Sequence, residues 1–252
     1  MKRLDLYLFE KGKAATRSQA ESLIRMGAVF VNGEKATKPG AQLRDNDKVT
    51  LSTKQQYVSR GGYKLESVSR RFKLDLQNKI VLDVGSSTGG FTDFALQNGA
   101  KKVIAVDVGT NQMHPALRND PRVELHEKTN ILEFGPSTAE IGRNNSKFKD
   151  LTSMVDVILI DLSFTSIRPA LKHIISLSDK ATEIVAMVKP QFEAGDKYKH
   201  KGVIKNERIR RDILKNFEEW IKQYYVIVNK ADSQITGEKG NKERFYLLRL
   251  KP

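Results

Sequence analysis

Residues 81–90, VLDVGSSTGG, decide the fold of the larger part of this 252-residue chain. Val81, Leu82 and Val84 have the apolar character of a buried strand, and Gly85, Gly89 and Gly90 follow closely. Glycines allow the backbone to turn tightly beside a ligand, and the next segment, FTDFALQNG, has the pattern of a helix. In open α/β sheets, ligands bind at such turns, at the carboxyl ends of the strands. The stretch therefore predicts a strand, a ligand-binding turn and a helix.

Apolar, β-branched runs recur after this stretch, each bounded by polar turns, at residues 101–109, 155–164 and 183–190. Segments with helical pattern or length separate them, and this alternation predicts a doubly wound, mostly parallel sheet. Two final strands are expected at 224–234 and 243–250, joined by a short Gly-rich segment. That connection is too short for a parallel crossover, so we expect the last strand to run antiparallel. A seven-stranded α/β sheet of this kind resembles the fold of class I methyltransferases.

Residues 1–53 follow a different pattern, that of a small α+β module. A first helix over RLDLYLFEKG is expected to end at Gly12, and a second to begin at a Thr16 cap and end at Gly27. The dipeptide Asn-Gly at 32–33 predicts a turn between two strands. Because a helix pair with a small β element has only a modest core, we expect a binding module rather than an enzyme.

The composition limits the class of protein. Apolar residues make up 39% and charged residues 29%, and the mean hydropathy is −0.48, which favours a soluble globular protein without a membrane span. The formal net charge of +14 favours a nucleic-acid partner over a protein that is merely basic. The sequence contains no cysteine, which excludes a disulfide framework and a cysteine nucleophile. The four histidines show no metal-ligand spacing, so we expect no metal. Because the chain has no cysteine and its charged start does not resemble a secretory signal, we expect a cytoplasmic location.

Positive charge is high in the smaller module. Residues 1–60 hold twelve Lys and Arg against six Asp and Glu. Basic residues on or beside the two expected helices, together with one next to the larger domain, are candidates for contacts with RNA phosphates. These candidates are Arg3, Lys13, Arg17, Arg25 and Arg60. The alternative for each of them is a solvated charge on the surface or in the linker.

Acidic residues near the glycine turn indicate which ligand it binds. Asp83 lies inside the strand, where a carboxylate would repel a pyrophosphate but attract the cationic end of S-adenosyl-L-methionine. Asp107 closes the next strand, where a carboxylate accepts ribose hydroxyls. The pair favours S-adenosylmethionine over NAD, with a purely structural turn as the remaining alternative. Asn130, after the third strand, is either an adenine contact or a helix cap. The loop supplies the other candidates, Gly85, Ser86, Ser87, Thr88, Gly89 and Gly90.

Four ionisable residues fall where a sheet of this kind gathers its site. Lys64 precedes the first strand, and Glu243 opens the last one. Asp161 and Lys189 follow apolar runs of the buried-strand type, and Pro190 holds Lys189 in extended geometry. A partly desolvated lysine among other charges can act as a base. Taken singly, each of the four has an ordinary alternative as a solvated charge at a strand end.

The motifs resemble known families. TRSQAESLI followed by VFVNG, within residues 2–50, resembles the S4 domain, a small RNA-binding module. Over nearly the whole chain, SRGGYKL, DVGSSTGG, DLSFTSI, VKPQFE and ITGEKGNKERF resemble, in this order, the TlyA (hemolysin A) family. That family joins an S4 domain to an FtsJ-like ribose 2′-O-methyltransferase. The expected organisation is therefore an S4 domain over 1–53, a linker over 54–60 and a methyltransferase domain over 61–252.

The resemblance also implies a site and a substrate. It implies that Lys64, Asp161, Lys189 and Glu243 form a catalytic Lys-Asp-Lys-Glu tetrad. It implies methyl transfer to ribosomal RNA or ribosomal subunits, with cytidine 2′-hydroxyls as targets. Glu193 is a second acid that competes with Glu243 for the last position. The loop KYKHKGVIKNE (197–207) departs from the family form and leaves open which nucleotide is recognised.

Other activities fit the sequence less well. A base amino-methyltransferase is expected to carry Asn/Asp-Pro-Pro-aromatic where this chain has DLSF (161–164). A non-catalytic RNA-binding or ribosome-assembly factor would not need both lysines and Asp161. For the membrane-lytic activity that the name hemolysin suggests, the sequence shows neither a spanning helix nor a long amphipathic apolar face.

Gly61 and Gly62 lie between Arg60 and Lys64. We expect a tight corner there, after which a helix presents Lys64 to the site.

Overall fold

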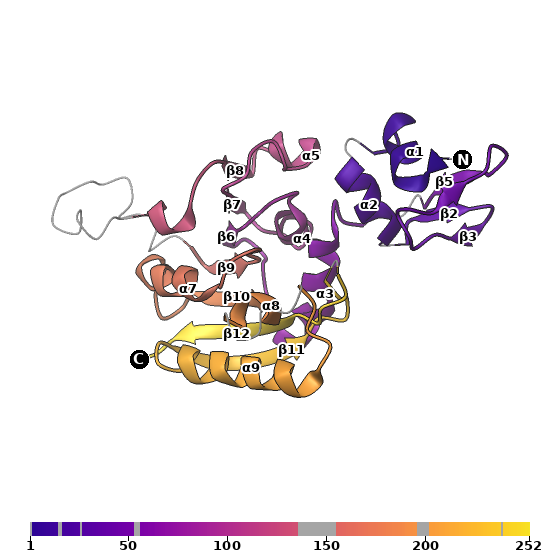
Figure 1. Cartoon of the computed structure of the whole chain (residues 1–252). Helices are drawn as coiled ribbons and strands as arrows, with labels where there is room; N and C mark the ends of the chain where they lie inside the picture. Colours follow the sequence, from indigo (N-terminus) through magenta and orange to yellow (C-terminus); the bar gives the residue numbers. More distant parts are fainter. Residues whose placement is uncertain are drawn as a thin grey trace. The chain divides into compact units, whose positions relative to one another are not determined.

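The computed structural model describes residues 2–14, 17–25, 27–52, 56–135, 155–195, 202–237 and 239–252. The expected cap at Thr16, and residues 54 and 55 of the expected linker, lie outside these ranges. The chain forms two compact units, Met1–Arg60 and Gly61–Pro252 (Figure 1). Each unit contains a hydrophobic core of its own.

The smaller unit packs a helix pair against short strands. Its elements are β1 (Lys2–Arg3), α1 (Leu4–Glu10), α2 (Arg17–Arg25), β2 (Val29–Val31), β3 (Glu34–Lys35), β4 (Gln42–Leu43) and β5 (Val49–Leu51). β1 pairs with β4, and β2 pairs with both β3 and β5, all antiparallel. Asn32 and Gly33 form the predicted turn, with φ of 52° and 84°, as a two-residue hairpin requires. Gly12 and Gly27 follow α1 and α2 as predicted, again with positive φ.

The core of this unit comes from helical spacing of apolar residues. Leu4 and Leu8, one turn apart on α1, are fully buried, and they pack with Leu23 and Ile24 of α2. Val29 of β2 completes the contact with the strands. The helix pair is therefore fixed on the β element by a small apolar core.

The larger unit alternates strands with helices. Its elements are α3 (Arg60–Phe72), β6 (Ile80–Val84), α4 (Gly90–Gln97), β7 (Lys102–Val106), α5 (Pro115–Arg118), β8 (Val123–His126), η1 (Ile131–Glu133), β9 (Val157–Ile160), α7 (Arg168–Ile174), η2 (Ile175–Leu177), β10 (Glu183–Val188), α8 (Pro190–Glu193), α9 (Glu207–Ile221), β11 (Tyr225–Asp232) and β12 (Arg244–Leu250). The strands form one seven-stranded sheet in the order β11-β12-β10-β9-β6-β7-β8. β12 is antiparallel to β10 and β11, and the pairs among β10, β9, β6, β7 and β8 are parallel. The predicted fold class, including the antiparallel last strand, is confirmed.

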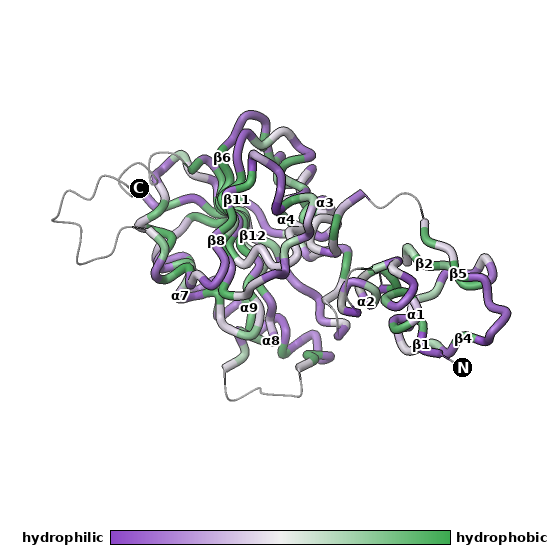
Figure 2. Tube along the Cα trace, turned by 90° about the horizontal axis from the view of Figure 1, so that it is seen from above, coloured by the Kyte–Doolittle hydropathy of each residue, from purple (hydrophilic) through white to green (hydrophobic). Residues whose placement is uncertain are grey.

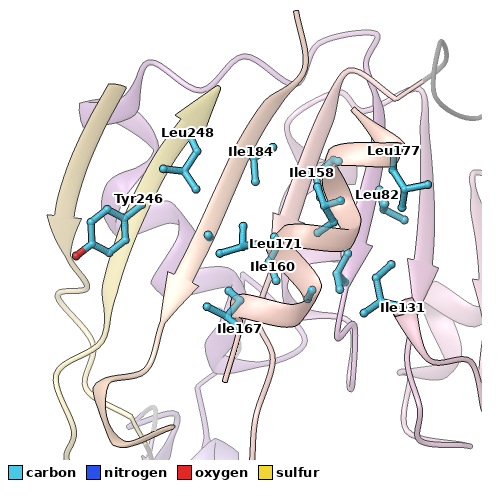
Figure 3. Packing of buried hydrophobic residues seen from close by; sticks show 14 of the residues in the cluster. Leu82, Ile131, Ile158, Ile160, Ile167, Leu171, Leu177, Ile184, Tyr246 and Leu248 are labelled. Atoms are coloured by element: carbon cyan, nitrogen blue, oxygen red, sulfur yellow. The ribbon is translucent and has the colours of Figure 1, made fainter. Parts of the chain in front are cut away.

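Helices cover both faces of this sheet. One face packs against α7 and α9, and Figure 3 shows Leu171 of α7, with Ile167 just before this helix, lying over Leu82, Ile158 and Ile184 of the strands. The opposite face lies against α4, whose Phe91 ring is 6.1 Å from that of Phe245 on β12. In Figure 2 the strands of this unit are mostly hydrophobic, as expected for a sheet buried on both faces.

Gly61 and Gly62 do not form the corner that the sequence predicts. They are the second and third residues of α3, which begins at Arg60, and neither has a positive φ. Glycine costs about 1 kcal/mol in a helix relative to alanine. The buried face of α3, which includes Leu65 and Val68, supplies the packing that stabilises the helix in spite of this cost.

Candidate active site

The glycine loop lies between β6 and α4, as predicted. Gly85 has φ +83°, and a Cβ there would lie 2.6 Å from the carbonyl oxygen of Asp161. The loop therefore needs glycine at this position, both for its conformation and for its close contact with the end of β9. Gly89, with φ +91°, precedes the first residue of α4, Gly90. Ser87 also has a positive φ of 47° and is exposed, as is Thr88.

Asp83 lies on β6, two residues before Gly85, and it is fully buried. Thr92 on α4 donates a hydrogen bond from Oγ1 to Asp83 Oδ2 at 2.6 Å. Asp83 Oδ1 and the buried Ser86 Oγ have no hydrogen-bond partner among the described residues. Burial raises the pKa of Asp83 to about 7, against the lowering effect of the Thr92 hydrogen bond. Two buried polar atoms without a protein partner at one loop are a place for a polar ligand group.

Asp107 lies at the end of β7 with its carboxylate held by backbone amides. Ser87 N donates to Oδ2 at 2.8 Å, and Gly109 N donates to Oδ1 at 2.6 Å. Gln112, which the sequence did not single out, accepts a hydrogen bond from Ser87 Oγ at 3.0 Å. Asn130 Oδ1 accepts a hydrogen bond from Leu132 N and caps η1, the second of its two predicted roles. Its role as an adenine contact stays a prediction.

The sheet register brings the charged candidates to one edge. Val84 pairs with Ile160, and Val188 pairs with Arg244 of the antiparallel strand β12. The residues that follow or precede these pairs are Gly85, Asp161, Lys189 and Glu243. They therefore lie side by side at the carboxyl edge of the parallel strands, where α/β sheets place their ligands.

Two short ion pairs form at this edge. Lys189 Nζ lies 2.5 Å from Asp161 Oδ1, and Lys64 Nζ lies 2.6 Å from Glu243 Oε2. The side chains of both lysines are 10% exposed or less, and that of Glu243 is 3% exposed. In both pairs the charged atoms are close together, but Asp161 Oδ1 and Glu243 Oε2 accept no hydrogen bond of good geometry from the described residues. All four residues singled out by the sequence are thus paired, lysine with acid, in one region.

Two neighbours of the pairs were missed by sequence reasoning. Lys189 Nζ donates a hydrogen bond to Ser163 Oγ at 2.6 Å. Phe164, the next residue, is 91% exposed and has φ +67°, an uncommon backbone conformation for a bulky side chain. Its ring lies 5.8 Å from that of Phe192. Ser163 and Phe164 belong to the DLSF motif (161–164), and this motif is the feature of the sequence that could have identified them.

Glu193 binds residues at the start of α7. Its carboxylate accepts hydrogen bonds from Ser166 Oγ, Ile167 N and Arg168 Nε, at 2.9, 2.8 and 3.1 Å. These contacts fix the start of α7. Glu243, and not Glu193, lies against Lys64.

The candidate RNA-binding residues have different settings. Arg3 and Arg17 both bind the buried Asp5. Lys13 and Arg25 are exposed, and Arg60 is half-buried at the start of α3. Their contacts with RNA stay predictions. Residues 197–201 of the loop that departs from the family form lie outside the described residues.

The described ranges hold neither a set of clustered metal ligands nor a helix of membrane-spanning character. No cluster of three or more His, Cys, Asp or Glu residues suited to a metal ion occurs there. Among the helices that the structure describes, none is long and apolar enough to cross a bilayer.

Comparison with known proteins agrees with this architecture. Residues 57–250 match the model of the FtsJ-like methyltransferase family, and residues 2–49 match the S4 domain. The Brachyspira hyodysenteriae protein named Hemolysin A is 40% identical, over 96% of this chain and 97% of its own. The Mycobacterium tuberculosis protein named 16S/23S rRNA (cytidine-2′-O)-methyltransferase TlyA is 34% identical, over 98% and 89%. A solved Streptococcus thermophilus structure is 35% identical and superposes with a TM-score of 0.73, over 99% of this chain and 88% of its own.

The fold and the glycine-loop site define a class I methyltransferase fused to an RNA-binding module. The chain belongs to the FtsJ-like methyltransferases and, among them, to the TlyA (hemolysin A) family, as the motifs predicted.

Proposed function

We propose that this protein methylates ribosomal RNA at a ribose 2′-hydroxyl, with S-adenosylmethionine as donor and a cytidine as target. The proposal depends above all on the two lysine–acid pairs beside the glycine loop, in which both lysines are buried. A 2′-hydroxyl must lose its proton as it is methylated, and this arrangement offers a base together with groups that hold it in place. The name of the Mycobacterium tuberculosis relative, which specifies the cytidine 2′-oxygen, supports the choice of target atom.

The residues around the loop fit S-adenosylmethionine. Asp83 Oδ1 and Ser86 Oγ, both buried and without a partner in the described chain, suit an ammonium and a carboxylate. Asp107 is fixed by two backbone amides and keeps lone pairs for ribose hydroxyls. Val108 and Leu132, which are 71% and 45% exposed, provide apolar surface beside Asp107 and Asn130 for a purine ring. When bound, S-adenosylmethionine supplies an electrophilic methyl group.

Lys189 is the proposed base. In this role the Lys189 ammonium first gives up a proton to solvent. The neutral amine then accepts the 2′-hydroxyl proton at Nζ as the ribose oxygen is methylated, and Lys189 ends as an ammonium again. Asp161, at 2.5 Å, stabilises the positive charge that Lys189 gains. Ser163 Oγ, at 2.6 Å, holds the direction of the amine. Lys64, held by Glu243, positions the ribose, and alignment of this kind supplies much of the rate in methyl transfer.

Phe164 is the proposed contact for the target nucleotide. An aromatic ring that is 91% exposed gains little from folding, and its positive φ carries a backbone cost. The ring stands one residue after Ser163, which binds the proposed base. A nucleotide base stacked on Phe164 would cover this surface and hold its ribose near Lys189.

Methylation of purified ribosomal subunits tests the function. Subunits from a strain that lacks the protein are incubated with it and with tritiated S-adenosylmethionine, and the labelled RNA is digested and mapped. We expect label on the 2′-oxygen of one or a few cytidines. Label on a base, or no label in either subunit or in free RNA, would overturn the proposal. The proposed substrate also implies that the protein works in the cytoplasm.

A further inference from the structure

Asp5 is a buried carboxylate that binds two arginines. The residue is 0% exposed, although it lies on the first helix of a small unit. Arg3 donates from Nε to Oδ1 at 3.0 Å and from Nη2 to Oδ2 at 2.8 Å. Arg17 donates from Nε to Oδ2 at 3.0 Å, and Leu6 N adds a fourth bond at 2.9 Å. The Arg3 hydrogen bonds are the largest of the effects that hold the pKa of Asp5 well below its usual range, so the group is a carboxylate at any working pH.

The three residues come from three different elements. Arg3 ends β1, Asp5 is in the first turn of α1, and Arg17 is the first residue of α2. Gly40 lies under the Arg3 guanidinium, since a Cβ there would be 3.5 Å from Nη1. The Arg3 guanidinium is therefore held by two hydrogen bonds and by packing, and the Arg17 guanidinium by one hydrogen bond to the same carboxylate. Part of the rotational freedom of these long side chains is already lost before any partner binds.

Both arginines keep donors for another acceptor. A guanidinium carries five N–H groups. Asp5 accepts hydrogen bonds from two N–H groups of Arg3 and from one N–H group of Arg17. Three N–H groups of Arg3 and four of Arg17 are therefore not bound to Asp5. The two side chains are 44% and 51% exposed, so the remaining donors are within reach of a partner. One buried carboxylate between two guanidiniums also reduces their mutual repulsion. Glu21 Oε1, 4.0 Å from Arg17 Nε, is a second acid at the edge of the cluster.

A charge-bearing surface fixed in this way fits a phosphate. Arginine presents a planar fork that matches phosphate oxygens, and forks that are held in advance lose less entropy when they bind. We propose that Asp5 is a positioning residue, which holds Arg3 and Arg17 as a two-pronged binding site for the phosphate backbone of RNA. This inference rests on the proposed RNA substrate. The competing explanation is that Asp5 only ties β1, α1 and α2 together.

Substituting Asp5 with asparagine separates positioning from charge. Asp5→Asn adds one positive charge to the protein, so charge alone predicts equal or tighter binding to RNA. Positioning predicts the opposite, because asparagine is neutral and holds two guanidiniums weakly. Asp45→Asn is the matched control, since Asp45 is exposed in the same unit and its loss adds the same charge. Binding is measured on the full chain with purified ribosomal RNA by filter retention, at several salt concentrations.

We expect Asp5→Asn to weaken binding about tenfold, while Asp45→Asn binds as tightly as the wild type or more tightly. The slope of log K against log salt is expected to stay constant in Asp5→Asn, because both cations remain. It is expected to fall by about 0.7 to 0.9 in Arg17→Ala, which removes one phosphate contact. Arg17→Lys is expected to keep the slope, because the charge remains, and to lose affinity. An arginine can bind Asp5 through Nε and a phosphate through its two terminal nitrogens, whereas lysine has a single ammonium nitrogen for both.

Circular dichroism and the melting temperature exclude a merely structural effect. A well-folded Asp5→Asn that binds RNA as tightly as Asp45→Asn would overturn the positioning role. If Asp5→Asn does not fold, the Arg17 variants decide, and unchanged affinity in both Arg17→Ala and Arg17→Lys overturns the site. Failure of the wild type to bind any ribosomal RNA would be a failure of the proposed function instead.

Discussion

Lys64 Nζ lies 2.6 Å from Glu243 Oε2, so a buried ion pair joins the first helix of the larger unit to the residue that precedes its last strand. The two residues are separated by most of the chain. Because β12 is antiparallel to β10, its start, and Glu243 just before it, lie at the edge where β10 ends. On the adjacent strands, Lys189 and Asp161 form the second pair. A sheet with only parallel strands would place the start of its last strand at the opposite edge.

Lys189→Ala is expected to lower kcat by about 10² to 10⁴, the range that a positioned base supplies. Binding of S-adenosylhomocysteine and of ribosomal RNA is expected to stay within about threefold, because Lys189 is proposed to act on the proton. Tritium transfer to ribosomal subunits and calorimetric titration measure the two quantities. Lys215→Ala, at a 77% exposed position on α9, is the control and is expected to match the wild type. Wild-type turnover in Lys189→Ala would remove this residue from the mechanism.

Glu243→Gln and Glu193→Gln are expected to fail in different ways. Glu243→Gln leaves the Lys64 ammonium buried without its charge partner, which disturbs the proposed site and is expected to lower kcat about 100-fold. Glu193→Gln weakens the contact with Arg168 at the start of α7, so about 1–3 kcal/mol of folding stability is expected to be lost. Its kcat is expected to stay within about threefold. Urea unfolding and methyl transfer on the same samples test both, and the reverse assignment of defects would contradict the placement of Glu243.

The sequence predicts the scaffold well because the relevant signals are local. The β-branched runs around Val84, Ile160 and Val188 are long enough to identify buried strands, and the short final connection requires the antiparallel turn. The site residues follow from these strands, since carboxyl ends of parallel strands meet at one edge. Family motifs then indicate which residues at that edge carry chemistry.

What the sequence does not predict depends on contacts distant along the chain. Asp5 looks like an ordinary polar helix residue until Arg17 is placed beside it. Ser163 becomes part of the site only through Lys189, which lies 26 residues further on. Gly61 and Gly62 illustrate the opposite error, because local propensity favours a turn there and tertiary packing of α3 overrides it.

Phe164→Ala is expected to lower kcat/KM for ribosomal subunits about tenfold or more, since stacking on one base is worth about 1–3 kcal/mol. Folding stability is expected to change by no more than about 0.5 kcal/mol, because the side chain is 91% exposed. Phe164→Tyr keeps a stacking surface and is expected to retain activity. Val226→Ala, another exposed apolar position, is the control. Equal kcat/KM for Phe164→Ala and the wild type would show that the ring does not meet the substrate.

Asp83 makes the stability of the protein without cofactor fall as pH rises. Burial raises its folded pKa to about 7, above the value of about 4 in an unfolded chain. Between these values the folded protein holds a proton that the unfolded chain has released, so the free energy of unfolding decreases with increasing pH. The contribution is fully present below about pH 4 and is lost as pH passes 7. Asp83→Asn is expected to remove this dependence, and thermal unfolding from pH 5 to 8 compares the two proteins.

Because the pKa of Asp83 is raised, we also expect cofactor binding to release a proton. At pH 6.5 the carboxyl of the free protein is mostly protonated, because burial raises its pKa to about 7. The α-ammonium of S-adenosylhomocysteine, placed near Asp83 Oδ1, favours the carboxylate and lowers that pKa. Calorimetric titration at pH 6.5 in phosphate and in Bis-Tris, which both buffer at this pH and differ in ionisation enthalpy, is expected to show release of a substantial fraction of one proton. At pH 8.5 release from this group is expected to vanish, and in Asp83→Asn it is expected at neither pH. Proton uptake by the wild type at pH 6.5 would mean that the ammonium group binds away from Asp83.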